Sequence, residues 1–288
     1  MPEKKIAFIG SGAMAEAMIT SLLRQKLAKP ENLRASDTHP ERVQELHEKY
    51  GVEPFTDNNQ AADRVDVVVL SVKPQRLTEV LGSLRGAIPS GALVLSIVAG
   101  ATIEKISKGL KHNAVVRSMP NTPAQIGEGI TVWIASPSVS ETQKETARTI
   151  LGAFGEEIDV DDEDYLDMAT ALSGTGPAYV FIFMEAMIDA GVHMGFSRRV
   201  SEQLVVQTLR GSVDYYQTIN QKSSVHVAAL KNQVTSPGGT TAEALYYLEK
   251  AGFRTAISRA IWAAYQRSLE LGREKPVHIP EADNGNEK

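Results

Sequence analysis

Cysteine is absent from this chain of 288 residues. A disulfide framework, a thiolate metal site and a cysteine nucleophile are therefore excluded. Neither sign of charge dominates, since the formal net charge is −5, so the sequence offers no basic surface for nucleic acid or an anionic membrane. No uncharged apolar run approaches the roughly 18 residues of a transmembrane helix, and the apolar stretch near the N-terminus is too short for a signal peptide. We therefore expect a soluble, cytoplasmic protein.

The usual catalytic motifs are missing as well. The sequence contains neither HExxH nor GxSxG with triad partners, and it shows no cluster of metal-ligating residues. Its six histidines are scattered, at His39, His47, His112, His193, His226 and His278. We expect no metal, and the chemistry must come from another source.

A dinucleotide-binding loop is present at the N-terminus. An apolar run, Ile6–Ile9, precedes Gly10-Ser11-Gly12-Ala13-Met14-Ala15, and a helical pattern follows from Glu16 to Lys26. This is G-x-G-x-x-A between a strand and a helix. The first glycine permits a tight turn, the second lets the backbone approach a pyrophosphate, and the small third residue allows close helix–strand packing. The motif predicts a nicotinamide dinucleotide site.

The choice between the two nicotinamide cofactors stays open. A second strand, Leu33–Ser36, ends at Asp37, 22 positions beyond Ala15, where a carboxylate could bind the ribose 2′-hydroxyl of NAD. Nearby Arg34, His39 and Arg42 could instead neutralise the 2′-phosphate of NADP. Asp37 could also be the N-terminal turn residue of a helix over 40–50.

Further strands are expected at 65–72, 93–100 and 114–119, each ending in small or polar residues, with helices at 75–84 and 103–110. Unalternated apolar runs such as 65–72 are typical of parallel strands covered on both faces. Ligands of such sheets bind beyond the carboxyl ends of the strands. Four loops should therefore line one crevice: 10–15, 71–74, 97–100 and 119–123. Strands at 131–134 and 156–160 and a helix at 141–154 complete the domain.

The second half is predicted to be all-helical, with helices at 164–172, 177–194, 198–220, 223–233, 241–250 and 252–272. Two stretches, 179–187 and 256–265, are apolar nearly all round, and such helices must be buried in a core or between subunits. We therefore predict a homodimer formed through these helices. The predicted domains are 1–162 for the dinucleotide, 163–275 for dimerisation and substrate, and a flexible polar tail over 276–288.

A second candidate site is the stretch Val234-Thr235-Ser236-Pro237-Gly238-Gly239-Thr240-Thr241, which runs into a helical pattern. Small residues leave backbone N–H groups uncovered, and the helix adds free amides and its positive dipole end. A bound carboxylate would fit there. The alternative is a flexible turn with an N-cap threonine.

Together these motifs resemble pyrroline-5-carboxylate reductase, the last enzyme of proline biosynthesis, over about residues 4–273. The two most specific are S-G-T-G-P-A-Y at 173–179 and V-T-S-P-G-G-T-T at 234–241. The others are G-x-G-x-M-A at 10–15, S-V-K-P at 71–74, V-A-G-A-T at 98–102 and M-P-N-T-P at 119–123.

The resemblance implies an α/β Rossmann-type N-terminal domain followed by an all-α dimerisation domain, dimers that can form larger rings, and NADP as cofactor, with NAD possible. It implies cofactor binding by Gly10, Ser11, Gly12, Ala13, Met14, Asp37, Asn58, Ser71, Val72, Lys73, Pro74, Val98, Ala99 and Asn121. It implies substrate binding by Val234, Ser236, Gly238, Gly239, Thr240 and Thr241.

The substrate so implied is a five-membered cyclic imine that carries a carboxylate, and hydride would add to its imine carbon. Thr241 is our candidate catalytic residue, as hydrogen-bond donor or proton relay to the nitrogen. Lys73 is the other candidate base, although its place beside Pro74 suits cofactor contact better. Two positions depart from the family pattern, Gln233 and Ser224.

Two rival functions remain open. A β-hydroxyacid dehydrogenase would carry a catalytic lysine after a Gly-x-Gly turn at the start of the helical domain, where this chain has Val180. A nicotinamide-sensing protein would bind the cofactor without consuming it.

Overall fold

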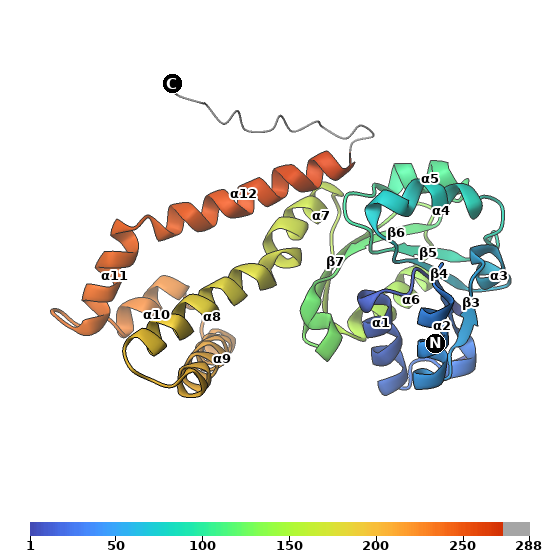
Figure 1. Ribbon diagram of the computed structural model, residues 1–288. Helices are drawn as coiled ribbons and strands as arrows, with labels where there is room; N and C mark the ends of the chain where they lie inside the picture. Colours follow the sequence, from blue (N-terminus) through green and yellow to red (C-terminus); the bar gives the residue numbers. More distant parts are fainter. Residues whose placement is uncertain (273–288) are drawn as a thin grey trace, which may run out of the picture. The chain divides into compact units, whose positions relative to one another are not determined.

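The computed structural model describes residues 1–272 (Figure 1). By its contacts the chain forms two compact units. Of the described residues, the first unit, here called the sheet unit, comprises 1–175 and 263–272. The second, the helical unit, comprises residues 176–262. The predicted flexible tail, 276–288, lies outside the described residues.

The sheet unit is built on one sheet of eight strands in the order β3-β2-β1-β4-β5-β6-β7-β8. Strands β1 to β6 are parallel to one another, β7 is antiparallel to β6, and β8 is parallel to β7. The order reverses beside β1, and at such a switch point the connections to β2 and β4 diverge and leave a crevice. The strands are β1 Ile6–Ile9, β2 Leu33–Ser36, β3 Glu53–Phe55, β4 Val67–Leu70, β5 Leu93–Ser96, β6 Val115–Met119, β7 Gly129–Ala135 and β8 Gly155–Asp159.

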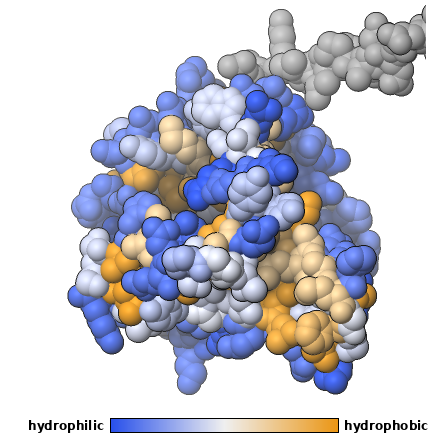
Figure 2. Space-filling model, turned by 90° about the vertical axis from the view of Figure 1, so that its left-hand side faces the viewer, coloured by the Kyte–Doolittle hydropathy of each residue, from blue (hydrophilic) through white to orange (hydrophobic). Residues whose placement is uncertain are grey.

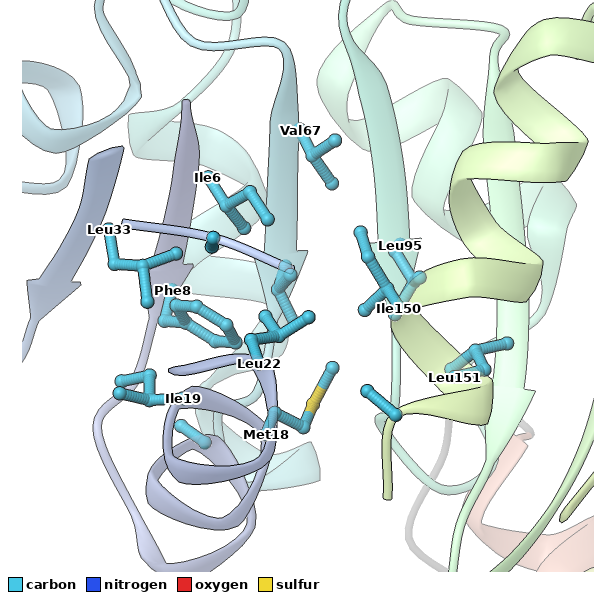
Figure 3. Packing of buried hydrophobic residues seen from close by; sticks show 14 of the residues in the cluster. Ile6, Phe8, Met18, Ile19, Leu22, Leu33, Val67, Leu95, Ile150 and Leu151 are labelled. Carbon is cyan, nitrogen blue, oxygen red and sulfur yellow. The ribbon is translucent and has the colours of Figure 1, made fainter. Parts of the chain in front are cut away.

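Helices cover both faces of this sheet. Side chains on both faces of the central strands are therefore buried, which explains why these strands are apolar at successive positions. In β1, Phe8 packs with Met18 and Ile19 of α1 on one face (Figure 3), whereas Ile9 belongs to the cluster on the opposite face. Burying a side chain such as Phe8 contributes about 2–3 kcal/mol. The helices of this unit are α1 Ala13–Arg24, α2 Pro40–Tyr50, α3 Asn58–Ala62, α4 Leu77–Ser83, α5 Ile103–Leu110, α6 Glu141–Gly152 and α7 Asp164–Ala169, with 3-10 turns η1 Pro30–Asn32, η2 Pro74–Arg76 and η3 Thr122–Ile126.

The elements differ from the predicted ones at several places. Helix α1 begins at Ala13, three residues before the predicted start, and therefore reaches into the glycine loop. Strand β3 and helix α3 were not predicted, because three and five residues are too few to show a period. The predicted strands 65–72 and 93–100 are shorter, since their last residues form the loops at the sheet edge.

A π-helical turn, η4 Thr170–Gly174, follows α7. The N–H of Thr175 donates to the carbonyl of Thr170 at 2.9 Å, and the Thr175 hydroxyl donates to the same oxygen. Such turns are rare and occur often at functional sites. This one ends at Ser173 and Gly174, the first two residues of the S-G-T-G motif.

The helical unit contains α8 Gly176–His193, α9 Arg198–Lys222, α10 Val227–Gln233, α11 Thr240–Lys250 and the first half of α12 Phe253–Gly272. Helices α8 and α9 pack against each other. An added Cβ on Gly191 would lie 2.6 Å from Ser201 Oγ, so the two backbones approach closely at this crossing.

Many large apolar side chains of the helical unit are exposed, among them Phe181, Ile182, Leu204, Tyr247 and Trp262. Apolar side chains show as orange patches on the surface drawn in Figure 2. By length and composition alone, the helical run Asp164–His193 could cross a membrane, and 6% of its apolar window is buried. These faces need a cover, which a folded chain obtains from a partner or a bilayer.

Candidate active site

The backbone conformation at the first position of the loop requires a glycine. Gly10 has φ +93°, and an added Cβ would lie 2.8 Å from the carbonyl oxygen of Ser71. The Ser71 hydroxyl donates to the carbonyl of Gly10 at 2.7 Å. The ends of β1 and β4 are therefore held in direct contact, with Gly10 at the junction.

The second glycine faces open space. Gly12 is the N-cap of α1, and an added Cβ would meet nothing within 4 Å. The first bond of the helix runs from Glu16 N–H to the Gly12 carbonyl at 3.0 Å, so the N–H groups of Ala13 and Met14 have no partner within the helix. This uncovered helix end offers amides and a positive dipole to an anion such as a pyrophosphate.

Asp37 lies at the end of β2 and binds the glycine loop directly. Its carboxylate accepts from the Ser11 N–H at 2.9 Å and from the His39 N–H at 3.1 Å, and a His39 ring nitrogen lies 2.9 Å away. Burial raises the pKa of Asp37, but these hydrogen bonds outweigh it and the pKa is lowered. Asn58 lies beside the same strand end, because its Oδ1 accepts from the Ser36 hydroxyl at 2.8 Å.

The two arginines near this strand end are already engaged. Arg42 donates to the Ser11 carbonyl at 2.8 Å and to the carboxylates of Glu45 at 2.7 Å and Glu16 at 2.5 Å. Arg34 donates to Glu53 and to two backbone carbonyls. Sequence reasoning considered Arg42 only as a phosphate-binding cation. Its role in holding the glycine loop gives no sequence signal, since it depends on the packing of α2.

The remaining residues predicted to bind the cofactor follow the next strands at the same edge. Val72 packs against Gly10, and Lys73 is exposed. The Val98 N–H donates to Ser96 Oγ at 3.2 Å, and Asn121 Oδ1 accepts from the Ile130 N–H at 3.0 Å. The structure thus brings all the predicted cofactor residues to the carboxyl edge of the parallel strands.

The S-G-T-G turn lies next to this edge. An added Cβ on Gly174 would lie 2.8 Å from Met119 Cε at the end of β6. The motif at 173–179 therefore begins against the loop that carries Asn121.

The predicted substrate loop lies in the helical unit, between α10 and α11. Gly238 has φ +67°, and the Gly239 N–H donates to the Ser236 carbonyl at 3.1 Å. The N-cap of α11 is Gly239, without a side-chain cap, so the alternative of an N-cap threonine is wrong. The first bond of α11 is Glu243 N–H to the Gly239 carbonyl, which leaves the N–H groups of Thr240 and Thr241 without partners within the helix.

The other substrate-loop positions are at the surface. Val234, Ser236 and Thr240 are exposed, and Thr241 is half-buried. Of the two departures from the family pattern, Gln233 is the last residue of α10 and Ser224 follows α9. Val180 is an exposed apolar residue of α8, so that position carries no base for alcohol oxidation.

The fold and the two loops define a nicotinamide-dependent oxidoreductase of the Rossmann type with a helical second part. Residues 5–100 match the family model "NADP oxidoreductase coenzyme F420-dependent", and residues 163–271 match "Pyrroline-5-carboxylate reductase dimerisation". The chain belongs to the pyrroline-5-carboxylate reductase family.

Relatives match over nearly the whole chain. The pyrroline-5-carboxylate reductase of Synechocystis sp. is 40% identical over 94% of this chain and 99% of its own, and that of Arabidopsis thaliana is 32% identical over 93% and 96%. Among solved structures, the Plasmodium falciparum pyrroline carboxylate reductase with NADP bound has a TM-score of 0.86 and 34% identity, covering 95% of this chain and 100% of that one. The Coxiella burnetii enzyme has a TM-score of 0.83 and 35% identity over 94% and 99%. The predicted family, fold class and use of NADP are confirmed.

Proposed function

We propose that this chain reduces 1-pyrroline-5-carboxylate to L-proline with hydride from NADPH, the last step of proline biosynthesis. The observation that carries the proposal is the presence of two uncovered helix ends in one chain of this family. One follows the glycine loop at Gly12, and the other follows Gly238-Gly239. The first suits a dinucleotide pyrophosphate and the second a small carboxylate.

The cofactor fits the residues at the sheet edge. The open space above Gly12 and the free amides of Ala13 and Met14 would take the pyrophosphate. On the β2 side, Asp37 and Asn58 would meet the adenosine half. On the β4 to β6 side, residues 71–74, 98–99 and 121 would meet the nicotinamide half. The bound cofactor supplies the hydride, and the protein supplies its position.

The substrate carboxylate would lie on the amides that begin α11. Hydride adds to the imine carbon, the C=N π electrons move to nitrogen, and nitrogen holds one added proton in the product. We propose that the Thr241 hydroxyl donates a hydrogen bond to that nitrogen or relays its proton. Ser236, Gly238 and Gly239 shape the loop so that the amides stay uncovered. Val234 would close one side.

We further propose that a second copy of the chain covers the apolar faces of the helical unit, and that such dimers can assemble into rings. The match to a dimerisation model over residues 163–271 supports association. A dimer would cover the run Asp164–His193 without a bilayer. We therefore place the protein in the cytoplasm, with neither a membrane nor a nucleic acid as partner.

The test follows the near-ultraviolet absorbance of reduced nicotinamide while the purified chain acts on 1-pyrroline-5-carboxylate, with NADPH and NADH in separate runs. We expect oxidation of the cofactor and one proline formed per cofactor consumed. Binding of NADPH without turnover would favour the sensing protein. Turnover only with a hydroxy acid would favour the dehydrogenase.

A further inference from the structure

The end of α12 packs backbone to backbone on the loop that follows β5. Gly100, in that loop, has φ +69°, and an added Cβ would lie 2.9 Å from the backbone nitrogen of Gly272 and 2.9 Å from Leu271 Cβ. In the reverse direction, a Cβ on Gly272 would lie 3.0 Å from the Gly100 carbonyl oxygen. No flexible side chain separates the two segments, so a shift of one is transmitted to the other.

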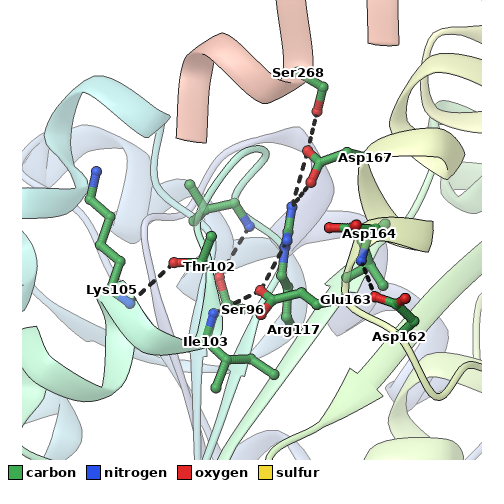
Figure 4. Close-up of polar contacts among 12 residues, drawn as sticks. Ser96, Thr102, Ile103, Lys105, Arg117, Asp162, Glu163, Asp164, Asp167 and Ser268 are labelled. Carbon is green, nitrogen blue, oxygen red and sulfur yellow. Dashed lines mark hydrogen bonds and ion pairs between the residues drawn. The ribbon is translucent and has the colours of Figure 1, made fainter. Parts of the chain in front are cut away.

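A buried polar cluster fixes the same end of α12. The Ser268 hydroxyl donates to Asp167 at 2.6 Å, and Asp167 pairs at 3.3 Å with Arg117 of β6 (Figure 4). Arg117 also donates to Glu163 at 2.9 Å. Ser268 is 1% exposed and Arg117 is 3% exposed, so no water can replace these partners without opening the packing.

The cluster also reaches the far end of the β5 loop. The Glu163 oxygen that binds Arg117 accepts the N–H of Ile103, the first residue of α5, at 2.8 Å. Within the loop, the Ala101 N–H donates to the Val98 carbonyl at 3.2 Å. The loop is therefore held by β5 at one end, by the first residue of α5 at the other, and by α12 across its middle.

We infer that the last turns of α12 hold the loop 98–100 where it meets the nicotinamide half of the cofactor, and that Ser268 and Gly100 are positioning residues. This rests on the proposed function, because the cofactor assignment of Val98 and Ala99 belongs to it. Strand order separates the two halves of the cofactor: β2 carries Asp37 on one side of β1, whereas β4 and β5 lie on the other. A displaced loop should therefore weaken contacts to the nicotinamide half and spare the adenosine half.

The experiment compares two ligands on the full chain. NADPH contains both halves, and adenosine 2′,5′-bisphosphate contains only the adenosine half. Gly100→Ala inserts a methyl group against Gly272, and Ser268→Ala removes the bond to Asp167. The matched controls are Gly86→Ala, where φ is also positive at +80° but nothing lies within 4 Å of an added Cβ, and Gln266→Ala, an exposed residue of the same helix.

We expect the Kd of NADPH to rise about tenfold in Gly100→Ala and about threefold or more in Ser268→Ala. The Kd of adenosine 2′,5′-bisphosphate should stay within about twofold of the parent in both variants, a difference that general destabilisation would not produce. The controls should bind both ligands like the parent. If Gly100→Ala does not fold, Ser268→Ala decides the question.

Parallel weakening of both ligands, or unchanged NADPH binding in Ser268→Ala, would overturn the inference and leave the proposed reaction standing. If the parent binds NADPH but does not reduce the imine, the proposed reaction is wrong. The comparison of NADPH with adenosine 2′,5′-bisphosphate would still decide the role of α12. A parent that binds no NADPH would overturn both.

Discussion

At the scale of single residues, the two glycines of the dinucleotide loop have different reasons to be glycine. Gly10 adopts a left-handed conformation and touches the Ser71 backbone, so a side chain is excluded by the protein itself. Gly12 has an ordinary extended backbone, and among the described residues no atom lies within 4 Å of an added Cβ. A side chain there would be excluded by the pyrophosphate that we propose binds at this helix end.

This difference predicts opposite effects of the same substitution. Gly10→Ala should lower the free energy of unfolding by about 1–3 kcal/mol, through backbone strain and the clash with Ser71. Gly12→Ala should cost less than about 1 kcal/mol in stability and should weaken NADPH binding at least tenfold, because its methyl group takes space needed by the phosphate. Thermal unfolding and NADPH fluorescence titration measure the two effects. Equal NADPH affinity in Gly12→Ala and the parent would contradict the pyrophosphate assignment.

Thr241 is the residue on which the proposed proton transfer depends. Thr241→Ala should lower kcat/KM by one to two orders of magnitude, about 1.4–2.7 kcal/mol, with NADPH binding intact. Thr218→Ala, which removes a hydroxyl that only bonds its own helix, is the control and should retain full activity. Activity of Thr241→Ala within threefold of the parent would remove this hydroxyl from the mechanism.

The spacing of the motifs predicted where the candidate site residues lie in the fold, but it did not predict their hydrogen-bond partners. Asp37 was placed by its distance from the glycine loop, and it directly follows the last residue of β2. Its bonds to Ser11 and His39 could not be predicted, because the loop backbone that supplies one donor takes its shape from contacts with β4. Cofactor choice depends on such bonds, which is why the sequence left it open.

At the scale of elements, Glu16 joins α1 to α2. Its carboxylate accepts from Arg42 at 2.5 Å, Lys49 at 2.8 Å and the Tyr50 hydroxyl at 2.7 Å. Burial raises the pKa of Glu16, but these three donors outweigh it and lower the pKa to about 2. Because Arg42 also binds the Ser11 carbonyl, the same network supports the glycine loop.

The lowered pKa gives a pH dependence with a definite sign. Ionised Glu16 stabilises the folded state fully above its ordinary pKa of 4.5, and this contribution is lost as the pH falls toward about 2. Glu16→Gln should therefore lower stability at neutral pH by about 1–2 kcal/mol, the usual value for partly exposed charged hydrogen bonds. Denaturant unfolding from pH 7 to pH 2.5 should show the gap to the parent shrinking below about pH 4.5. Glu48→Gln on α2 is the control, and a gap independent of pH would refute this account.

Elements long enough to show a repeating apolar pattern were predicted, and short or irregular elements were not. The apolar run that contains β4 and the helical pattern that contains α9 both span enough residues to show a period. Strand β3 is Glu-Pro-Phe, with no alternation to detect, and it forms because its backbone pairs with β2. The π turn at Thr170–Gly174 was not predicted: the sequence suggested that one helix ends at 172 and the next begins at 177. A single turn with i→i+5 hydrogen bonds is too short to produce a recognisable apolar pattern.

At the scale of the whole molecule, the exposed apolar side chains of the helical unit predict association. Phe181 and Ile182 of α8 are 60% and 65% exposed. A carboxylate placed in a covered apolar interface without a partner costs about 3–5 kcal/mol. The double substitution Phe181→Glu and Ile182→Glu should therefore shift the protein from dimer or larger assembly to monomer and lower kcat at least tenfold. Light scattering coupled to gel filtration measures the mass, and Gln44→Glu on α2 is the control. An unchanged mass would place the interface elsewhere.

A change of pattern near residue 162 led us to predict a domain boundary there, whereas the path of the last helix was not predicted. Helix α12 is continuous from Phe253 to Gly272, yet its residues from Ala263 onward pack with the sheet unit. The helical pattern shows no break at that point, because both halves present apolar and small residues. The burial of Ser268 distinguishes the second half, and it depends on Asp167, which lies 101 positions away.

The chain thus passes between its two units at two places, near Thr175 and near Trp262. A single protease cut near Thr175 would divide the chain into two polypeptides, and the packing of the last turns of α12 on the sheet unit, through Gly272 and Ser268, would then keep the helical unit attached without a covalent link. A second cut near Trp262 would release the helical unit, and it would have to fall inside a helix whose end is anchored in a buried ion cluster. The same double attachment means that a fusion or circular permutation opening one crossing still leaves a covalent tether between the halves.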